Sequence, residues 1–302
     1  MFLSILTSMI KVVVLGSSAA VPSVNRNLSS VGLRFNGDVY LFDCGEGTQR
    51  QMMRFGLSYA KVRCIFVSHS HADHIVGIAG LAQTLDMIGR KEPLLIFCPR
   101  GSHHHIEALL SIGNYCYEIS VNEVGEGKVF EGEGFTVSAF EVRHSRPTLG
   151  YIFKQSDRRN FNERKCKSLG IKGRMFGELE RKGEITIGGK TVKYEDVSTV
   201  KPGIKIVYAG DCLPSESTVL AAKEADLLLH EATYASDKAK EAEENMHSTA
   251  AQAAEIALRA GAKKLVLVHL SGRYKTTEQH LKEAREIFTN SDVAEDGSEF
   301  HF

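Results

Sequence analysis

Short apolar runs that lead into an ionisable residue recur along the chain. Six such runs are rich in β-branched and aromatic side chains, which is typical of buried strands: 39–42, 64–67, 135–142, 204–209, 226–229 and 265–268. The ionisable residues at or just beyond their ends are Asp43, His69, His144, Asp211, His230 with Glu231, and His269. Because sites in layered α/β proteins gather outside the carboxyl ends of strands, this pattern predicts one convergent site.

Helical patterns lie between these strands, at 47–55, 75–88, 104–111, 215–225, 249–259 and 277–288. Thr249 and Gln252 have the spacing of a capping box, and Gly261 is placed to end the same helix. The predicted strands lack the polar alternation of an exposed sheet face. We therefore predict an α/β (α+β) fold of two facing mixed sheets with helices outside, an αββα sandwich.

Composition narrows the class of protein. The chain of 302 residues is 43% hydrophobic, so it can build a sizeable core, and we predict a single domain over 1–302. Its six cysteines show no CxxC pairing and lie mostly in or beside apolar runs, as expected for buried packing residues in a reducing cytoplasm. No apolar run is long enough to cross a bilayer. The first ten residues make a poor signal peptide, and Met9 is an alternative start to Met1.

Charge is balanced overall but not locally. The 37 basic and 37 acidic side chains cancel, so any affinity for nucleic acid must come from clustering. Residues 154–193 hold 12 basic and 5 acidic side chains, a net charge of +7, and six glycines. We interpret 154–200 as an inserted, protruding and partly structured basic arm that lies along phosphates, with Lys172 and Arg174 as candidate contacts. The alternative is a solvated loop without a partner.

The clearest chemistry follows the strand at 64–67. Three imidazoles and a carboxylate, His69, His71, His74 and Asp73, stand on one turn. Imidazole nitrogen and carboxylate oxygen suit zinc-like ions, and a polar surface turn is the alternative. The stretch resembles the H-x-H-x-D-H signature of the metallo-β-lactamase superfamily.

Further stretches resemble the ribonuclease Z family in its short form. They run in family order along nearly the whole chain: 42–51, 69–74, 144–151, 209–211, 230–233, 247–249 and 269–274. The resemblance implies an endoribonuclease that removes the 3′ trailer from tRNA precursors by metal-activated hydroxide attack, just after the discriminator nucleotide. The products are a tRNA 3′-hydroxyl and a trailer 5′-phosphate. It also implies a homodimer in which one subunit's arm holds the RNA that the other cuts, with no membrane and no obligatory partner protein.

The resemblance assigns roles to residues. His69, His71 and His144 would hold one zinc, while Asp73, His74 and His269 would hold a second. Asp211 would bridge the two ions, which suits a carboxylate because it has two oxygens. His247 with Glu231 would supply the proton for the departing oxygen, and Asp73 would act as proton acceptor. Manganese remains an alternative to zinc.

Other candidates have weaker support. Asp43 is expected to support the ligands rather than bind metal. His230 either supports the site or is simply buried beside it, and Arg273 contacts either an RNA phosphate or an internal carboxylate. Arg26 belongs to the loop 22–27, where Val24 stands at a position at which the family often has lysine, and is a candidate substrate contact. His103 to His105 are interpreted as an exposed loop and helix start, and His280 and His301 as surface residues.

Two other functions remain open at this level. The first is a small-molecule metallo-hydrolase on the same fold, such as a phosphodiesterase or lactonase. The second is an RNA-binding protein that keeps the fold without the activity. The basic arm and the stretch 230–233 argue against the first, and the complete set of expected ligands argues against the second.

Overall fold

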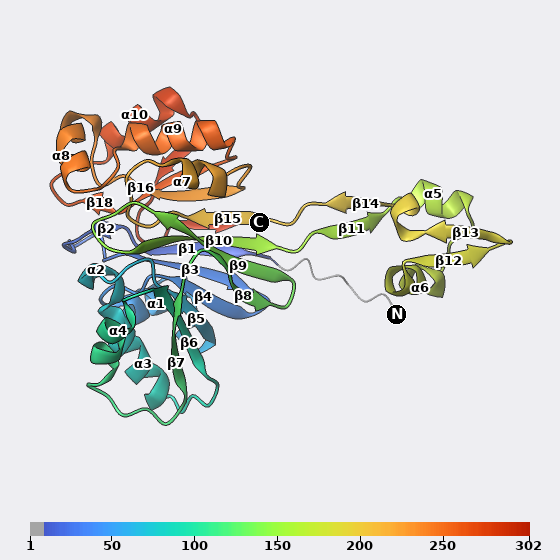
Figure 1. Ribbon diagram of the computed structural model, residues 1–302, viewed down its shortest axis with the longest axis horizontal. Helices are drawn as coiled ribbons and strands as arrows, with labels where there is room; N and C mark the ends of the chain where they lie inside the picture. Colours follow the sequence, from blue (N-terminus) through green and yellow to red (C-terminus); the bar gives the residue numbers. More distant parts are fainter. Residues whose placement is uncertain (1–8) are drawn as a thin grey trace. The chain divides into compact units, whose positions relative to one another are not determined.

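The computed structural model describes residues 9–302 (Figure 1). The choice between Met1 and Met9 as the start concerns residues 1–8, which lie outside the described residues. The contacts divide the chain into two compact units. We call residues 9–153 with 205–302 the main unit and Lys154–Ile204 the inserted unit, and each is described by itself.

Two seven-stranded mixed sheets form the centre of the main unit. In the first, the order β20-β1-β3-β4-β5-β6-β7 joins Glu299–His301, Lys11–Gly16, Ser30–Phe35, Asp38–Phe42, Val62–Phe66, Leu94–Pro99 and Ile119–Val124. In the second, the order β19-β17-β16-β15-β10-β9-β8 joins Ser291–Val293, Leu265–Val268, Leu227–Glu231, Lys205–Tyr208, Thr148–Gln155, Phe135–Val142 and Gly127–Gly132. Neighbouring strands from β4 to β7 are parallel, as are those from β15 to β19 in the sheet order.

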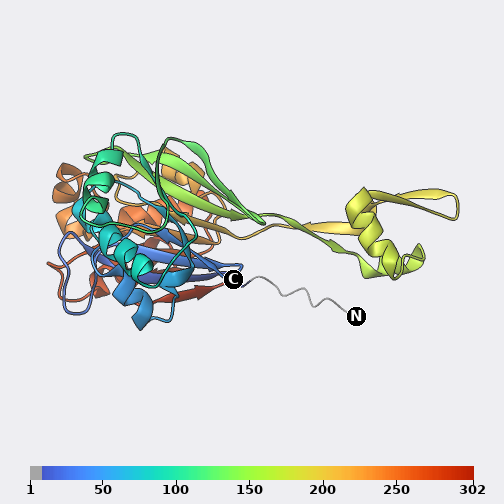
Figure 2. The same ribbon diagram turned by 90° about the horizontal axis from the view of Figure 1, so that it is seen from below.

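Helices cover the outer faces of both sheets (Figure 1). Beside the first sheet lie α1 (Thr48–Arg54), α2 (Ala72–Ile75), α3 (Gly77–Met87) and α4 (His103–Leu110). Beside the second lie α7 (Glu216–Ala221), α8 (Ala239–Glu244), α9 (Ala250–Ala260) and α10 (Glu278–Ile287). Figure 2 shows the same layering from a second direction. The predicted αββα sandwich is therefore confirmed.

Both faces of the central strands are buried, which explains their continuous apolar character. Aromatic rings fill the space between the sheets. The ring of Phe42 in β4 lies 6.1 Å from that of Tyr151 in β10 and 5.8 Å from that of Tyr208 in β15. The opposite faces pack aliphatic side chains against the helices, so each sheet contributes to two apolar layers.

One predicted helix differs in detail. The expected helix at 75–88 is two helices, α2 and α3, and the first begins at Ala72. Gly77 opens α3 against the backbone of the β4–α1 turn, where an added Cβ would stand 1.9 Å from the carbonyl oxygen of Gly45. Only glycine permits this approach, which holds the histidine turn against the end of β4. By contrast, α9 follows the predicted capping box at Thr249 and ends at Gly261.

The inserted unit has more regular structure than the partly structured arm we expected. Strands β11 (Arg158–Phe161) and β14 (Ser198–Lys201) pair, as do β12 (Glu184–Ile187) and β13 (Lys190–Lys193). Between them lie α5 (Glu163–Ser168), α6 (Arg174–Lys182) and the short helix Tyr194–Val197. Its own small core contains Cys166, Ile171, Leu179, Ile185, Val192 and Val197. Scattered apolar residues thus make a compact unit despite the high charge.

No helix between residues 9 and 302 is long and apolar enough to span a membrane. The six cysteines all occur as free thiols, and five of them are buried.

Candidate metal centre

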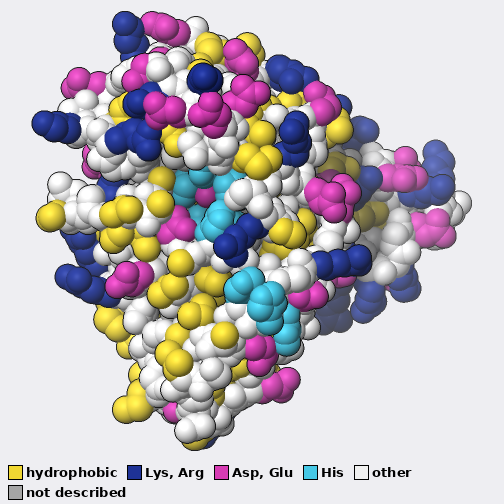
Figure 3. All heavy atoms as spheres, turned by 60° about the vertical axis from the view of Figure 1, so that its left-hand side comes forward, with side chains coloured by type: hydrophobic (Ala, Val, Ile, Leu, Met, Phe, Trp, Pro, Cys, Tyr) yellow, Lys and Arg dark blue, Asp and Glu magenta, His cyan; other side chains and the backbone are white. Residues whose placement is uncertain are grey.

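Strand ends from both sheets bring the predicted residues to one place. His69 follows β5 of the first sheet, while Asp211 and His269 follow β15 and β17 of the second. His144 follows β9. On the molecular surface, histidine side chains gather in a hollow on this face, with acidic side chains among them (Figure 3). The sites of parallel sheets form in this way because the carboxyl ends of their strands meet at one edge.

Backbone strain marks two of these strand ends. Asp43 and His269 have φ values of +59° and +55°, in the left-handed region that non-glycine residues rarely adopt. Each lies directly after its strand, and its side chain faces the cluster. Asp43 contacts His74, and His269 contacts Asp73 and Asp211. Strain of this kind costs on the order of 1–3 kcal/mol and persists only where neighbouring contacts impose it.

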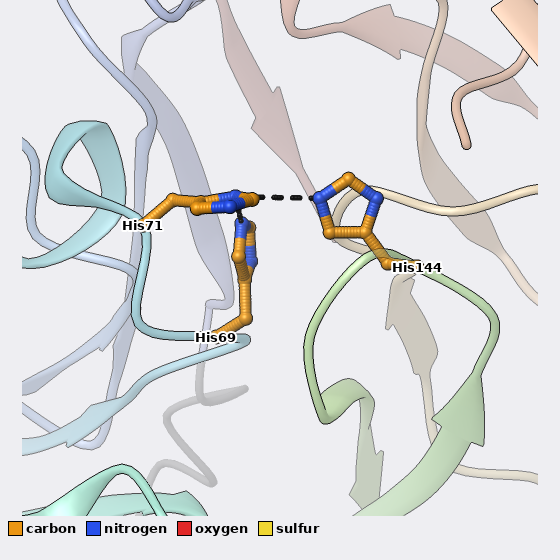
Figure 4. A group of neighbouring side chains, drawn as sticks. All are labelled: His69, His71 and His144. Carbon is orange, nitrogen blue, oxygen red and sulfur yellow. Dashed lines mark hydrogen bonds between the residues drawn. The ribbon is translucent and has the colours of Figure 1, made fainter. Parts of the chain in front are cut away.

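Three histidines form the first group of possible ligands (Figure 4). The Nε2 atom of His69 lies 2.8 Å from Nδ1 of His71, which lies 3.3 Å from Nε2 of His144. His69 is fully buried, while the other two are partly exposed to solvent. Three imidazole nitrogens therefore converge on one point.

A second group adjoins the first. Asp73 Oδ2 lies 3.5 Å from Nε2 of His74 and 3.4 Å from Nε2 of His269. Asp211 lies between the groups, because its Oδ2 atom is 3.3 Å from His74 Nε2, 3.2 Å from His269 Nε2 and 3.8 Å from His69 Nε2. The structure thus brings together all seven residues that the sequence proposed as ligands.

Hydrogen bonds on the outer side of four imidazoles orient the rings. The Nδ1–H groups of His69, His74, His144 and His269 face the Ser68 hydroxyl, the Asp43 carboxylate, the Met246 carbonyl and the Thr233 hydroxyl, at 3.0, 2.7, 2.9 and 2.9 Å. Ser68 and Thr233 donate their own protons to Asp43 and Glu231, so each hydroxyl is free to accept. Each ring therefore presents Nε2 to the cluster, which is how proteins orient metal-binding histidines.

This arrangement fits metal ions. Four Nε2 atoms, one Nδ1 atom and two carboxylates face one another, and the buried Nε2 of His74 has no hydrogen bond of acceptable geometry, although Asp211 is near. Nitrogen and oxygen atoms of this kind suit zinc and similar divalent ions. The cluster is therefore a candidate metal centre.

Electrostatics around the cluster point the same way. Burial lowers the pKa of His69 well below its ordinary value and that of His71 to about 4, which keeps both rings neutral and able to bind a cation. Burial alone would raise the pKa of Asp211, but His269 and His74 hold it well below its usual range. Burial opposes the charged form of His74 too, yet Asp211 and Asp43 raise its pKa well above normal. A cation at this nitrogen therefore competes with a proton.

A histidine–carboxylate pair stands next to the cluster. The Nδ1 atom of His247 lies 2.8 Å from Oε1 of Glu231, and its ring lies 5.0 Å from that of His144 and 5.5 Å from that of His269. The backbone N–H groups of Cys212 and Thr233 donate to the buried Glu231 carboxylate and hold it. Burial would lower the pKa of His247, but Glu231 outweighs it and raises the pKa to about 9, so the imidazole is protonated at neutral pH.

Other predicted residues have separate tasks. Asp43 contacts His74 but none of the remaining ligands, as expected for a supporting carboxylate. His230 is buried, with its Nδ1–H donating to the Glu231 carbonyl and Nε2 facing the Cys212 thiol, which favours a packing role. Arg26 is partly buried and donates to Ser17 and to the carbonyl of Ala294, so it braces its own loop.

The remaining basic candidates differ among themselves. Arg273 pairs at 2.8 Å with Glu241 and lies over the ring of Tyr234; this carboxylate is exposed rather than internal. Lys172 and Arg174 are exposed on the inserted unit. The prediction that His280 lies on the surface is wrong. It is fully buried against Tyr274, because α10 turns that face toward the core.

Four contributors to the site were missed from sequence. Ser68 and Thr233 connect ligands to carboxylates, and Tyr208 donates to Asp43 at 2.7 Å. Thr233 is the last residue of the stretch 230–233, and Ser68 sits beside His69, so both had a signal in their position. The carbonyl of Met246 had none, because any residue supplies a carbonyl.

Comparisons with known proteins agree with this geometry. A family model described as the β-lactamase superfamily domain matches residues 39–161 and 196–270. The ribonuclease Z of Methanosarcina acetivorans is 44% identical over 95% of this chain and 96% of its own, and that of Myxococcus xanthus is 41% identical over 96% and 97%. The crystal structure of the short form of human tRNase Z superposes with a TM-score of 0.70 at 29% identity, over 96% of this chain and 98% of that one.

The fold and the histidine–aspartate cluster define a hydrolase of the β-lactamase superfamily. Identity over nearly the full length of both chains narrows this class. The chain belongs to the ribonuclease Z family of endonucleases, and the resemblance noted in the sequence is confirmed.

The position of Asp43 generates a stability prediction. Its carboxylate accepts four buried hydrogen bonds, two from Ser68 and one each from His74 and Tyr208. In the Asp43→Asn variant the amide NH2 group faces donors, so we expect a loss of about 3 kcal/mol in the free energy of unfolding. Urea unfolding in the presence of a chelator measures this apart from metal binding.

Asp38→Asn is the matched control, because Asp38 begins the same strand and forms an exposed ion pair with Arg63 at 3.5 Å. It should cost less than about 1 kcal/mol. Equal losses in the two variants would contradict the role given to Asp43.

Proposed function

We propose that the protein is a zinc-dependent endoribonuclease that removes the 3′ trailer from tRNA precursors. Membership of the ribonuclease Z family supports tRNA precursors as the substrate, because the relatives are named ribonuclease Z and tRNase Z. The observation that carries the chemistry is the cluster of seven inward-facing ligands, with the His247–Glu231 pair beside it. A small-molecule phosphodiesterase or lactonase on the same fold is the alternative that the test below separates.

His69, His71 and His144 would hold one zinc ion and Asp73, His74 and His269 a second, with Asp211 between them. Such a pair lowers the pKa of a water molecule and offsets the charge on a phosphoryl group in displacement. Manganese is the other candidate, because the same nitrogen and oxygen ligands accept it.

The side chains of this protein manage the protons. Asp73 accepts a proton from the attacking water, and its contact with the backbone N–H of Ala20 at 2.9 Å orients the carboxylate. The hydroxide displaces the 3′ oxygen from phosphorus, so the P–O3′ bond breaks and the phosphate stays with the trailer. His247, held by Glu231, gives its proton to the departing 3′ oxygen.

The inserted unit is proposed to bind the body of the tRNA. Several of its basic side chains, including Arg164, Lys167, Lys172 and Arg174, form no ion pair within residues 9–302. Unpaired cations on a compact unit suit phosphate contacts, whose strength falls with salt. We further propose a homodimer in the cytoplasm, in which one subunit's inserted unit holds the RNA that its partner cleaves.

Cleavage of a tRNA precursor tests the function. The protein should cut once, just after the discriminator nucleotide, and end-group analysis should find a 3′-hydroxyl on the tRNA and a 5′-phosphate on the trailer. His247→Ala should reduce the single-turnover rate by about 10²-fold or more, the typical contribution of a general acid. Cleavage elsewhere, or turnover of small diesters only, would favour the alternative function.

A second substrate checks the role of His247. A bis(p-nitrophenyl) phosphate diester releases a phenolate that leaves without protonation, so His247→Ala should slow its hydrolysis far less than it slows RNA cleavage. Similar losses on the two substrates would mean that His247 does not act as proton donor.

Metal analysis tests the paired site. Asp211→Ala should lower the content of both ions, because Asp211 lies between the groups, whereas His269→Ala should lower chiefly one. The measurement is the metal content per chain after gel filtration, determined by mass spectrometry for each variant. His301→Ala, on an exposed histidine in β20, is the control. Full metal content in Asp211→Ala would rule out a shared ligand.

Deletion of the inserted unit tests RNA binding. Joining Phe153 to Lys205 through a short glycine linker removes the unit at the boundaries that the contacts define. We expect KM for the tRNA precursor to rise by at least about tenfold while hydrolysis of the small diester persists. Unchanged KM on RNA would leave the unit without its proposed task, and the small diester controls for misfolding of the main unit.

A further inference from the structure

One cation beside the cluster has no assigned role. Arg146 follows the ligand His144 by two residues and is exposed. Its Nη1 atom lies 3.3 Å from the hydroxyl and 3.4 Å from the carbonyl oxygen of Ser70, the residue between His69 and His71. These long contacts steer the guanidinium to the rim of the hollow and leave its remaining N–H groups for another acceptor.

Arg146 lies close to the first group of ligands. It contacts Ser70, which stands between the ligands His69 and His71, and it follows the ligand His144 by two residues. Figure 3 shows further histidine side chains beside the hollow on this face.

Within residues 9–302, no carboxylate forms an ion pair with Arg146. Arg273, which was predicted to touch substrate, differs in this respect. Arg273 is paired with Glu241, and the N-terminus of α4 is occupied by Glu123, which accepts from the N–H groups of Gly101 and His103. An exposed, unpaired guanidinium at the edge of a cation-binding hollow is suited to a phosphate, which it can hold through two N–H groups.

We propose that Arg146 binds the first phosphate of the RNA trailer beyond the one that is cleaved. This inference rests on the proposed function and identifies the side of the site on which the trailer lies. His247, which protonates the departing tRNA oxygen, contacts the rings of His144 and His269. Arg146 contacts the turn at Ser70 instead. The strand that remains attached to phosphorus then runs away from His247 and past Arg146.

Precursors with trailers of different length test this proposal. A trailer of one nucleotide has no phosphate beyond the cleaved one, whereas a trailer of four nucleotides has three. Arg146→Ala should lower kcat/KM for the longer trailer by about tenfold, as expected for the loss of one charge-assisted contact. It should change kcat/KM by less than about twofold for the one-nucleotide trailer and for bis(p-nitrophenyl) phosphate. Arg146→Lys should recover part of the loss, because it keeps the charge without the planar fork.

Arg143→Ala is the matched control, because Arg143 is an exposed arginine on the same loop that makes none of these contacts. It should behave as the unmodified protein on all three substrates, and metal content should be unchanged in every variant. An equal loss on all three substrates in Arg146→Ala would place Arg146 at the cleaved phosphate. An equal loss on the two precursors alone would place it on the tRNA side. Either result, or no loss, overturns the proposal.

A binding measurement separates this inference from the proposed function. A fluorescent 5′-phosphorylated tetranucleotide, the product trailer, should bind Arg146→Ala at least several-fold more weakly than Arg143→Ala. If the protein cuts no tRNA precursor, the proposed function fails. Equal tetranucleotide binding by the two variants then overturns the Arg146 assignment as well, whereas weaker binding by Arg146→Ala retains a single-stranded RNA contact at this rim.

Discussion

The carboxylate of Asp43 is the constraint on which the site depends. It is fully buried at the end of β4 and joins Ser68 after β5, His74 in α2 and Tyr208 at the end of β15. One acceptor thus ties the first sheet to the second at the edge where the ligands meet. A buried carboxylate is costly unless its lone pairs are used, and here four hydrogen bonds use them. The same bonds orient His74 and, through Ser68, His69.

A second buried carboxylate organises the other side of the cluster. Glu231 holds His247 directly and His269 through the hydroxyl of Thr233. The proposed proton donor and a proposed metal ligand therefore share one support. Displacement of Glu231 would disturb both, which explains why its carboxylate is held by two backbone N–H groups as well as by a hydroxyl. Such outer contacts decide which nitrogen of each ring faces inward.

Charge is distributed by task rather than evenly. The whole chain is neutral, yet the inserted unit concentrates basic side chains around a small core of its own. In the main unit, Arg146, the arginine that we assign to substrate, forms no ion pair and lies beside the cluster. Arginines elsewhere that looked equally suitable, Arg26 and Arg273, are held by internal acceptors or by a carboxylate. Whether an arginine is free depends on its neighbours in space and cannot be read from its neighbours in sequence.

The sequence by itself determined the layered fold and the strand ends at which ionisable residues gather, and its resemblance to a family assigned the seven candidate ligands, with Asp211 between the two groups. Hydrophobic periodicity, apolar runs and residue chemistry are local properties. An apolar run that ends in a histidine therefore predicts both a buried strand and a possible metal ligand. Tertiary structure alone decided the rest. It recruited Tyr208 and the carbonyl of Met246, buried His280 and folded the charged segment into a compact unit. These outcomes depend on contacts between residues far apart in the chain, because an acceptor or a packing face is defined only when a distant segment arrives beside it.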